Sequence, residues 1–261
     1  MNAGATPSHD PTGDEPARDR GVEVRDVVPA GGPVIRCLLS GDPGAPVLVL
    51  LHGLGEGSAS WDDVAPGFAE RFGVVALDLR GHGASGWPRE YSYELMRDDV
   101  VGVLDALGLG EVVLVGHSMG GAVAHLVTQT RPDRVAALVL EDAPPPFPRA
   151  PRTLPDRPPG PLPFDWAMLT AVLADTDDPS LRWWPGLASV SAPTLVLAGG
   201  PTSTTPQERV PEMAAAIPDC TLVTVPVGHH VHVGDPDGFT AAVLGWLDTD
   251  RVARRIGTPG R

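Results

Sequence analysis

A serine enclosed by glycines is the residue of this chain best suited to covalent chemistry. Ser118 is the centre of the run Gly-His-Ser-Met-Gly at residues 116–120, between the apolar segment Glu111–Val115 and a helical pattern that begins at Met119. In a tight turn from strand to helix, flanking glycines let neighbouring backbone pass close by, and the serine hydroxyl lies at a helix N-terminus that favours negative charge. We predict Ser118 as the nucleophile of an acyl-transfer reaction. The alternative is a glycine-rich turn with an inert serine.

Three histidines late in the chain could supply the base that such a nucleophile needs. His229, His230 and His232 follow the apolar segment Thr221–Val225. A base must lie on a loop that reaches the serine hydroxyl, accept its proton and return it to the leaving group. The same histidines could instead bind zinc, but the chain has neither the HExxH pattern nor the paired cysteines that accompany such sites. We therefore expect no metal and no cofactor.

The elements that would position these residues can be inferred from hydrophobic periodicity. Continuous runs of β-branched residues and leucine predict strands that are buried on both faces, and apolar residues spaced three and four apart predict helices between them. Such alternation is typical of an α/β fold with a mostly parallel, doubly wound sheet and helices on both faces. The predicted strands are Val34–Leu39, Val47–Leu51, Val74–Leu79, Glu111–Val115, Val135–Leu140, Thr194–Ala198 and Thr221–Val225. The predicted helices are Ser92–Leu107, one that begins around Met119–Gly121 and ends at about Thr130, Pro211–Ile217 and Phe239–Leu247.

One stretch, residues 143–192, interrupts this alternation. Ten prolines lie between positions 144 and 163, a density that excludes a central strand and disfavours long helices. The same stretch contains Trp166, Trp183 and Trp184. We predict a short cap over a substrate pocket to which these tryptophans contribute. The alternative is a surface excursion whose tryptophans simply pack on the body of the protein.

The other boundaries follow from composition. Residues 1–20 are polar and rich in proline and aspartate, which predicts a disordered tail. The core of the fold is assigned to residues 21–142 and 193–250, and residues 251–261 to a C-terminal tail. A chain of 261 residues is long enough for one such domain with a cap.

Composition also excludes several classes of function. A net charge of −14 argues against nucleic acids and anionic membrane surfaces as partners, because both attract cationic proteins. All basic residues are arginine, which excludes a P-loop lysine or a Schiff-base lysine and suggests a bacterial genome rich in G and C. There is no signal-peptide pattern and no apolar run long enough to span a membrane. We expect a soluble, cytoplasmic protein acting on a small molecule; the sequence does not indicate its oligomeric state.

Four motifs in a common order give the chain a family resemblance. They are His-Gly-Leu-Gly at 52–55, Asp-Leu-Arg-Gly-His-Gly-Ala-Ser at 78–85, the run around Ser118, and Gly-His at 228–229. From about Val34 to Leu247 the chain resembles the α/β-hydrolase superfamily, in the lineage of small bacterial esterase- and haloperoxidase-like serine hydrolases.

The resemblance implies roles for several residues. His229 would be the base, His232 would occupy a structural position, and His52 would hold the loop that it begins. The backbone N–H groups of Leu54 and Met119 would form the oxyanion hole, which stabilises the negative oxygen of an acyl-transfer intermediate.

The acid of the triad departs from the common family pattern. Its usual loop, after Thr194–Ala198, has no carboxylate until Glu208. In haloalkane-dehalogenase-like members the acid can follow the preceding strand, and matching Arg-Val at 134–135 to theirs puts it at Asp142, with Glu141 an adjacent, outward-facing residue. Asp142 could also simply begin a turn before a proline. We favour Asp142 as the acid because the usual loop is empty.

These inferences predict a hydrolase that cleaves a small, moderately apolar carboxylic ester through an acyl-enzyme on Ser118. One alternative is hydrolysis of a lactone or of a carbon–carbon bond by the same residues. Another is a catalytically inactive binding protein, which the missing loop acid suggests. Dehalogenase and epoxide hydrolase activities do not carry over, because they require an aspartate nucleophile at this position.

Overall fold

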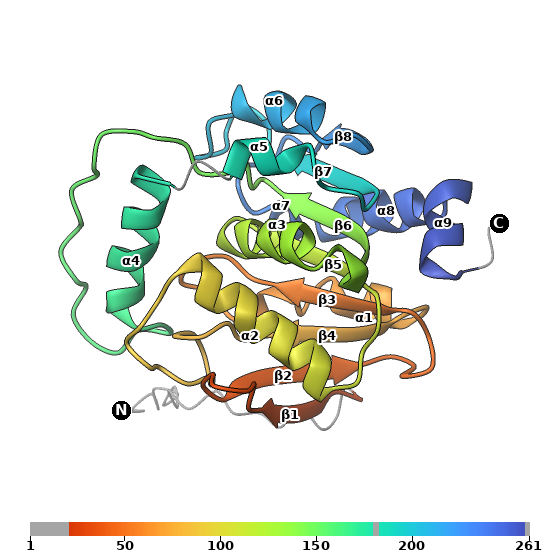
Figure 1. Ribbon diagram of the computed structural model, residues 1–261, viewed down its shortest axis with the longest axis horizontal. Helices are drawn as coiled ribbons and strands as arrows, with labels where there is room; N and C mark the ends of the chain where they lie inside the picture. The colour runs from red at the N-terminus through yellow and green to blue at the C-terminus, as the bar shows by residue number, and fades with distance from the viewer. Residues whose placement is uncertain (1–20, 180–182, 259–261) are drawn as a thin grey trace, which may run out of the picture.

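The computed structural model describes residues 21–179 and 183–258. These residues form one eight-stranded sheet in the order β1-β2-β4-β3-β5-β6-β7-β8 (Figure 1). β2 pairs antiparallel with β1 and β4, and the other pairings are parallel. The predicted α/β fold with a mostly parallel sheet is therefore confirmed. The strands are β1 Glu23–Val27, β2 Ile35–Ser40, β3 Val47–Leu51, β4 Gly73–Leu77, β5 Val112–His117, β6 Val135–Glu141, β7 Thr194–Ala198 and β8 Cys220–Thr224.

Seven of these strands overlap the predicted ones, and β1 is the strand that the sequence pattern did not indicate. Four of its five residues are exposed, and Glu23, Arg25 and Asp26 leave it without an apolar run. An edge strand needs only backbone pairing with its neighbour, so it lacks the hydrophobic signature of a buried strand. β3 and β7, by contrast, lie inside the sheet and coincide with their predicted ranges.

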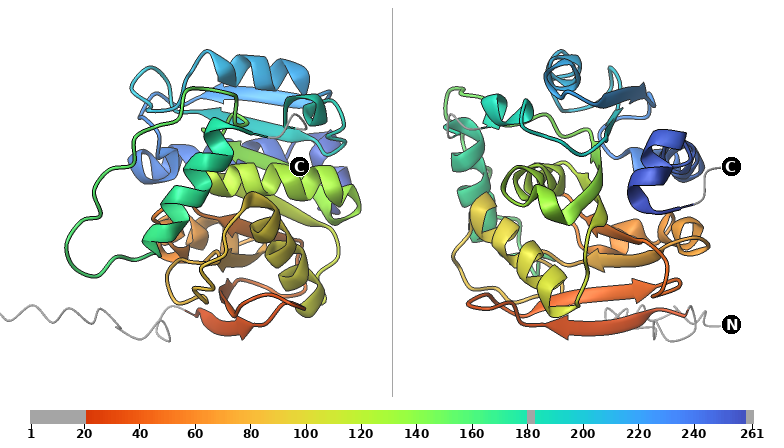
Figure 2. Two further views of the ribbon diagram at one scale, coloured as in Figure 1. Left: turned by 60° about the vertical axis from the view of Figure 1, so that its left-hand side comes forward. Right: turned by 45° about the vertical axis from the view of Figure 1, so that its right-hand side comes forward.

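Helices cover both faces of the sheet (Figure 2). On one face α2, α3 and α6 bury apolar side chains such as Met96 and Val123. On the other face α1, α8 and α9 bury Phe68, Phe239 and Ile256. None of the described helices is long and apolar enough to cross a membrane. The helices are α1 Ala65–Ala69, α2 Tyr93–Ala106, α3 Met119–Thr130, α4 Trp166–Asp177, α5 Trp183–Leu187, α6 Arg209–Ala216, α7 Val231–Gly234, α8 Pro236–Leu247 and α9 Asp250–Ile256, with short 3-10 turns η2 Ser58–Trp61 and η3 Pro132–Arg134.

The helix α9 corrects one boundary. It occupies most of the segment that the sequence assigned to a C-terminal tail, and Val252, Ala253 and Ile256 are buried on the core. Their spacing is that of one helix face, but over so few turns it is a weak signal. The predicted tail at residues 1–20 lies outside the described residues.

The predicted cap contains an extended proline-rich segment and α4, both at the left of Figure 1, and α5, which lies near α6. Backbone hydrogen bonds tie its end to the loop after β4: Gly83 N–H donates to the Pro163 carbonyl and Asp165 N–H to the Gly81 carbonyl, both at 2.8 Å. The Tyr91 hydroxyl donates to the Asp165 carboxylate at 2.7 Å. Because the prolines lie in the extended part, α4 can form uninterrupted after them.

Candidate active site

Ser118 lies between β5 and α3 with a backbone that non-glycine residues seldom adopt. Its φ is 49° and its ψ is −114°. A 3.0 Å hydrogen bond from the Ser118 N–H to the Glu141 carbonyl joins the turn to the end of β6. Its sharpness depends on Gly116 and Gly120, where an added Cβ would lie 2.4 Å from the Gly120 carbonyl oxygen and 2.2 Å from the Leu51 carbonyl oxygen, respectively. The strained turn presents the serine hydroxyl at the N-terminus of α3.

We expect the substitution Gly120→Ala to destabilise the protein by at least about 3 kcal/mol, because the obstacle is backbone and cannot move aside. The measurement is the free energy of unfolding in urea. The matched control is Gly245→Ala in α8, where no heavy atom lies within 4 Å of the added Cβ; we expect it to be neutral or stabilising by up to about 1 kcal/mol. Equal effects of the two substitutions would contradict the assigned packing of the turn.

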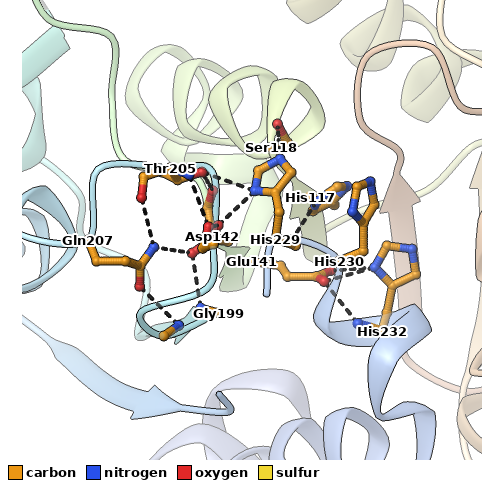
Figure 3. A network of polar contacts seen from close by, with 12 residues as sticks. His117, Ser118, Glu141, Asp142, Gly199, Thr205, Gln207, His229, His230 and His232 are labelled. Carbon is orange, nitrogen blue, oxygen red and sulfur yellow. Dashed lines mark hydrogen bonds and ion pairs between the residues drawn. The ribbon is translucent and has the colours of Figure 1, made fainter. Parts of the chain in front are cut away.

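The structure brings Ser118, His229 and Asp142 into one chain of hydrogen bonds (Figure 3). The Ser118 Oγ lies 3.0 Å from His229 Nε2, and His229 Nδ1 lies 2.7 Å from Asp142 Oδ2. In this arrangement the serine hydroxyl donates to Nε2 and the Nδ1–H donates to the carboxylate, the tautomer that a general base needs. Three elements supply these residues: the β5–α3 turn, the end of β6 and the loop after β8.

The Asp142 carboxylate is buried and accepts hydrogen bonds from three donors besides His229. Oδ1 accepts from the Gly199 N–H at 3.0 Å and from Gln207 Nε2 at 2.8 Å, and Oδ2 accepts from the Ser203 hydroxyl. Burial alone would raise its pKa, but the hydrogen bonds from His229, Ser203, Gly199 and Gln207 lower the pKa to about 2. The loop after β7, which has no carboxylate before Glu208, therefore supplies donors that keep the Asp142 carboxylate ionised.

This depressed pKa predicts a pH-dependent contribution to stability. Asp142 ionises at about 2 when folded against 3.8 ordinarily, so its charged form stabilises the fold above about pH 4 and this contribution is lost as the pH falls toward 2. The difference in unfolding free energy between the unaltered chain and Asp142→Asn should therefore shrink between about pH 5 and about pH 3. Urea titrations at several pH values measure it. A difference that stays constant with pH would show that Asp142 has an ordinary pKa.

The other two carboxylates considered for the acid lie elsewhere. Glu141 is fully buried, not outward-facing as expected: it precedes Asp142 at the end of β6, and both its oxygens lie 2.8 Å from His232 Nδ1. His232, stacked on the buried Trp61, thus has the structural position implied for it. Glu208 is exposed at the start of α6.

A second polar group, which the sequence interpretation missed, lies next to the loop that carries His229. His117 Nε2 donates to the His229 carbonyl at 3.0 Å, and its Nδ1 lies 3.4 Å from Glu56, which is also 2.9 Å from His230 Nε2. Burial lowers the pKa of His117, but the charges of Glu141 and Glu56 outweigh it and raise the pKa overall. A charged His117 can donate from both nitrogens, to the carboxylate and to the carbonyl that fixes His229.

The three late histidines therefore do not form the zinc site that was considered for them. His229 contacts Asp142, His232 contacts Glu141, and His230 contacts Glu56. Among the described residues, the group able to share a metal ion is Glu56, His117 and His230, whose ligand atoms lie within 4.8 Å of one another. Within this group the Glu56 carboxylate contacts both His117 Nδ1 and His230 Nε2.

The predicted oxyanion donors border the same cavity as the serine. Leu54 and Met119 both line it. The Met119 N–H belongs to the first turn of α3, where amides have no acceptor within the helix. The amides on either side of Leu54 are occupied, by Glu56 at 2.9 Å and by His82 Nε2 at 3.1 Å, whereas no hydrogen bond within the described part of the chain uses the Leu54 amide.

His52 holds this loop, as the resemblance implies. Its Nδ1 donates to the Gly53 carbonyl at 2.7 Å, and its Nε2 accepts from the Leu79 N–H at 2.9 Å. The side chain is fully buried, and burial lowers its pKa, which favours the neutral ring that can accept at one nitrogen and donate at the other. The oxyanion loop is thereby fastened to the chain that follows β4.

A cavity of about 230 Å³ opens above Ser118 and His229. Residues of the predicted cap contribute much of its wall. The predicted pocket residues need correction, because Trp166, Trp183 and Trp184 do not line this cavity. The residues from the cap that do are Ala143, Pro144, Pro145, Pro146, Phe147, Arg149, Arg152, Val172, Leu173 and Thr176.

The tryptophans instead fasten the cap to the body and to itself. Trp183 is buried, with its ring 5.3 Å from the Tyr93 ring and 5.8 Å from the His125 ring. Trp184 donates its indole N–H to the Pro146 carbonyl at 3.1 Å. Trp166 lies against Phe164 at the start of α4. A short cap has little apolar surface, so its largest side chains are used for packing.

Comparisons with known proteins agree with this fold. A family model described as the alpha/beta hydrolase fold matches residues 46–162. The sn-1-specific diacylglycerol lipase ABHD11 of Mus musculus is 31% identical over 278 residues, covering 88% of this chain and 90% of that protein. Epoxide hydrolase 4 of Mus musculus is 36% identical over 110 residues, 41% of this chain and 31% of that protein. A solved structure of a hydrolase from Pseudomonas aeruginosa PA01 has a TM-score of 0.77 at 27% identity and covers 87% of this chain and 98% of that chain. This chain belongs to the α/β-hydrolase fold family.

Proposed function

We propose that this protein hydrolyses a small carboxylic ester through an acyl-enzyme on Ser118. The observation that carries the proposal is the line of contacts from Ser118 Oγ to His229 at 3.0 Å and from His229 to Asp142 at 2.7 Å. These contacts lie at the base of a cavity whose wall also holds Leu54 and Met119. Nucleophile, base, acid and oxyanion donors are thus all within reach of one bound carbonyl group.

The first half of the reaction transfers the acyl group to the enzyme. His229 Nε2 takes the proton of Ser118 as the Oγ attacks the ester carbonyl, and the carbonyl oxygen becomes an oxyanion facing the Leu54 and Met119 amides. Asp142 stabilises the imidazolium that has formed. When the tetrahedral intermediate collapses, the bond from carbon to the alcohol oxygen breaks and His229 returns its proton to the departing alcohol.

The second half releases the acid. His229 takes a proton from a water molecule, whose oxygen attacks the acyl carbon and forms a second oxyanion at the same two amides. The bond to Ser118 Oγ then breaks, His229 reprotonates the serine, and the carboxylic acid leaves. The enzyme returns to its starting state with no net change in charge or oxidation.

The geometry removes the reason for considering a catalytically inactive binding protein. It depended on a triad without an acid, and Asp142 lies where such an acid would act on His229. A binding protein would also have no use for a serine held at a strained φ of 49°, since strain of this kind is typical of catalytic turns. The same residues could equally cleave a lactone, which is a cyclic ester, so lactones belong in the substrate panel.

The test combines covalent labelling with turnover. A fluorophosphonate reacts with an activated serine, and we expect mass spectrometry of the digested adduct to locate it on Ser118. Turnover of 4-nitrophenyl acetate, butyrate and octanoate, together with a small lactone, would define the acyl preference. Labelling of a different residue, or an unlabelled protein that still hydrolyses esters, would contradict the proposal.

A further inference from the structure

The cavity above Ser118 has two arginines in its wall, both from the proline-rich part of the cap. Arg149 and Arg152 line it together with apolar residues of the cap and of α4. The carboxylate that lines the same cavity is Asp142, which is committed to His229. A pocket for a purely apolar ester needs no cation in its wall, so the two arginines require an explanation.

Arg152 has its charge balanced. Its Nε lies 2.8 Å from Asp177 Oδ1, its terminal nitrogen is at the same distance, and its backbone N–H donates to Asp177 Oδ2 at 2.8 Å. Asp177 is buried at the end of α4, and these contacts lower the pKa of its carboxyl despite the burial that would raise it. Arg152 and Asp177 thus form an ion pair that braces the cap.

Arg149 also faces the Asp177 carboxylate, but its contact with that carboxylate is longer than the contact made by Arg152. Its Nε is 3.6 Å from Asp177 Oδ1, beyond hydrogen-bonding distance, and this buried N–H has no hydrogen-bond partner within the part of the chain that the structure describes. The central carbon of the guanidinium lies 4.3 Å from the centre of the Phe147 ring, a cation–π contact that takes up none of the group's N–H donors. Two cations therefore face one carboxylate, and the surplus charge belongs to Arg149.

The unbalanced charge of Arg149 is energetically unfavourable when the cavity holds no anion. Burial and the nearby charge of Arg152 lower the pKa of Arg149 below its usual value, although a guanidinium stays protonated at any working pH. An unpaired buried N–H donor also carries a desolvation penalty. Both costs are relieved if an anion enters the cavity and accepts hydrogen bonds from Arg149.

We propose that Arg149 binds a carboxylate of the substrate, so that the ester hydrolysed here carries an anionic group remote from its scissile carbonyl. The planar fork of a guanidinium matches the two oxygens of a carboxylate. Arg152, fixed by Asp177, adds to the positive potential at this end of the cavity. This inference rests on the proposed ester hydrolysis and specifies its substrate class.

The test compares esters that differ only in a remote charge. One arm places the carboxylate on the acyl chain: mono-4-nitrophenyl adipate against its methyl ester. The other places it on the leaving group: 4-carboxyphenyl butyrate against its methyl ester. For each pair the readout is the ratio of kcat/KM for the anionic ester to that for the neutral one, after subtraction of spontaneous hydrolysis. We expect a ratio of at least about ten in one arm, as for one charge-assisted hydrogen bond.

Substitutions at position 149 test whether the preference for anionic esters depends on Arg149. Arg149→Gln removes the charge and should lower the ratio to about one or below, and Arg149→Lys, which keeps the charge without the fork, should give an intermediate ratio. Both should fold, because the side chain has no hydrogen bond to lose at Nε and its backbone bond to the Asp177 carbonyl remains. The control is Arg157→Gln, an exposed cap arginine outside the cavity, which should leave the ratio unchanged.

The outcomes separate this inference from the function on which it rests. If Ser118 is labelled and neutral esters are hydrolysed, but neither arm shows a preference for the anion, the carboxylate subsite is wrong and ester hydrolysis stands. A preference that survives Arg149→Gln also overturns the assignment to Arg149. If no ester of either charge is hydrolysed and Ser118 is not labelled, the proposed function itself fails.

Discussion

Ser118→Ala should hydrolyse 4-nitrophenyl esters at least about 10⁴-fold more slowly than the unaltered chain. Without the hydroxyl there is no acyl-enzyme, and what remains is the attack of water on an ester that the oxyanion amides still bind. Alanine keeps the Cβ of serine, so the substitution adds no backbone strain to the turn, where φ is 49°. Steady-state kinetics and loss of fluorophosphonate labelling measure the effect.

The matched control is Ser189→Ala, an exposed serine whose hydroxyl donates to the nearby Gly186 carbonyl. It should keep full activity and full labelling. Both variants should unfold in urea within about 0.5 kcal/mol of the unaltered chain, so that the loss cannot be attributed to misfolding. A Ser118→Ala variant that retains most of its activity would remove the basis for the acyl-enzyme.

Hydrophobic pattern was a good guide to this fold wherever burial was two-sided. β3 and β7 were predicted to the residue because every side chain in such strands is apolar, whichever face it points to. β1 escaped prediction because it is an exposed edge. The cap tryptophans were misplaced for a related reason: apolarity predicts that Trp183 is buried, but not whether it is buried against a ligand or against Tyr93 and His125.

In the candidate site, too, the local sequence did not reveal which polar groups are neighbours in three dimensions. The Gly-His-Ser-Met-Gly run identified Ser118 locally, because a tight strand-to-helix turn has a local signature. Ser203 and Gln207, which hold Asp142, have no such signature, since they depend on β6 and β7 lying side by side. An unusually polar loop after β7 was the available clue. In the structure, the polar side chains of this loop hydrogen-bond to the Asp142 carboxylate.

The choice between Glu141 and Asp142 also depended on three-dimensional structure. The two are adjacent in sequence, and both side chains are buried. β6 ends at Glu141, and Asp142 takes a left-handed φ of 47°, which turns its carboxylate toward His229 while Glu141 reaches His232. Aspartate and asparagine adopt this conformation more readily than most residues. The left-handed backbone at position 142 therefore explains why Asp142, and not Glu141, contacts His229.

Asp142→Asn should lower kcat for ester hydrolysis by about 10³- to 10⁴-fold with little change in KM. An asparagine fits the left-handed backbone and the shape of the site, but it can present its NH₂ to His229 Nδ1 and so favour the tautomer with the proton on Nε2, which cannot accept from Ser118. It also leaves the imidazolium of the transition state without its counter-charge. Fluorophosphonate labelling of Ser118 should slow in parallel.

Two carboxylate controls make this result specific. Glu208→Gln removes an exposed charge from the start of α6 and should leave kcat unchanged. Glu141→Gln disturbs the buried contact with His232 and should lower the free energy of unfolding, because a buried charged partner is lost, while the folded fraction keeps Asp142 and its contact with His229. If Glu208→Gln abolishes turnover and Asp142→Asn does not, the acid lies on the usual loop after β7, and the hydrogen bonds that gather around Asp142 serve only the fold.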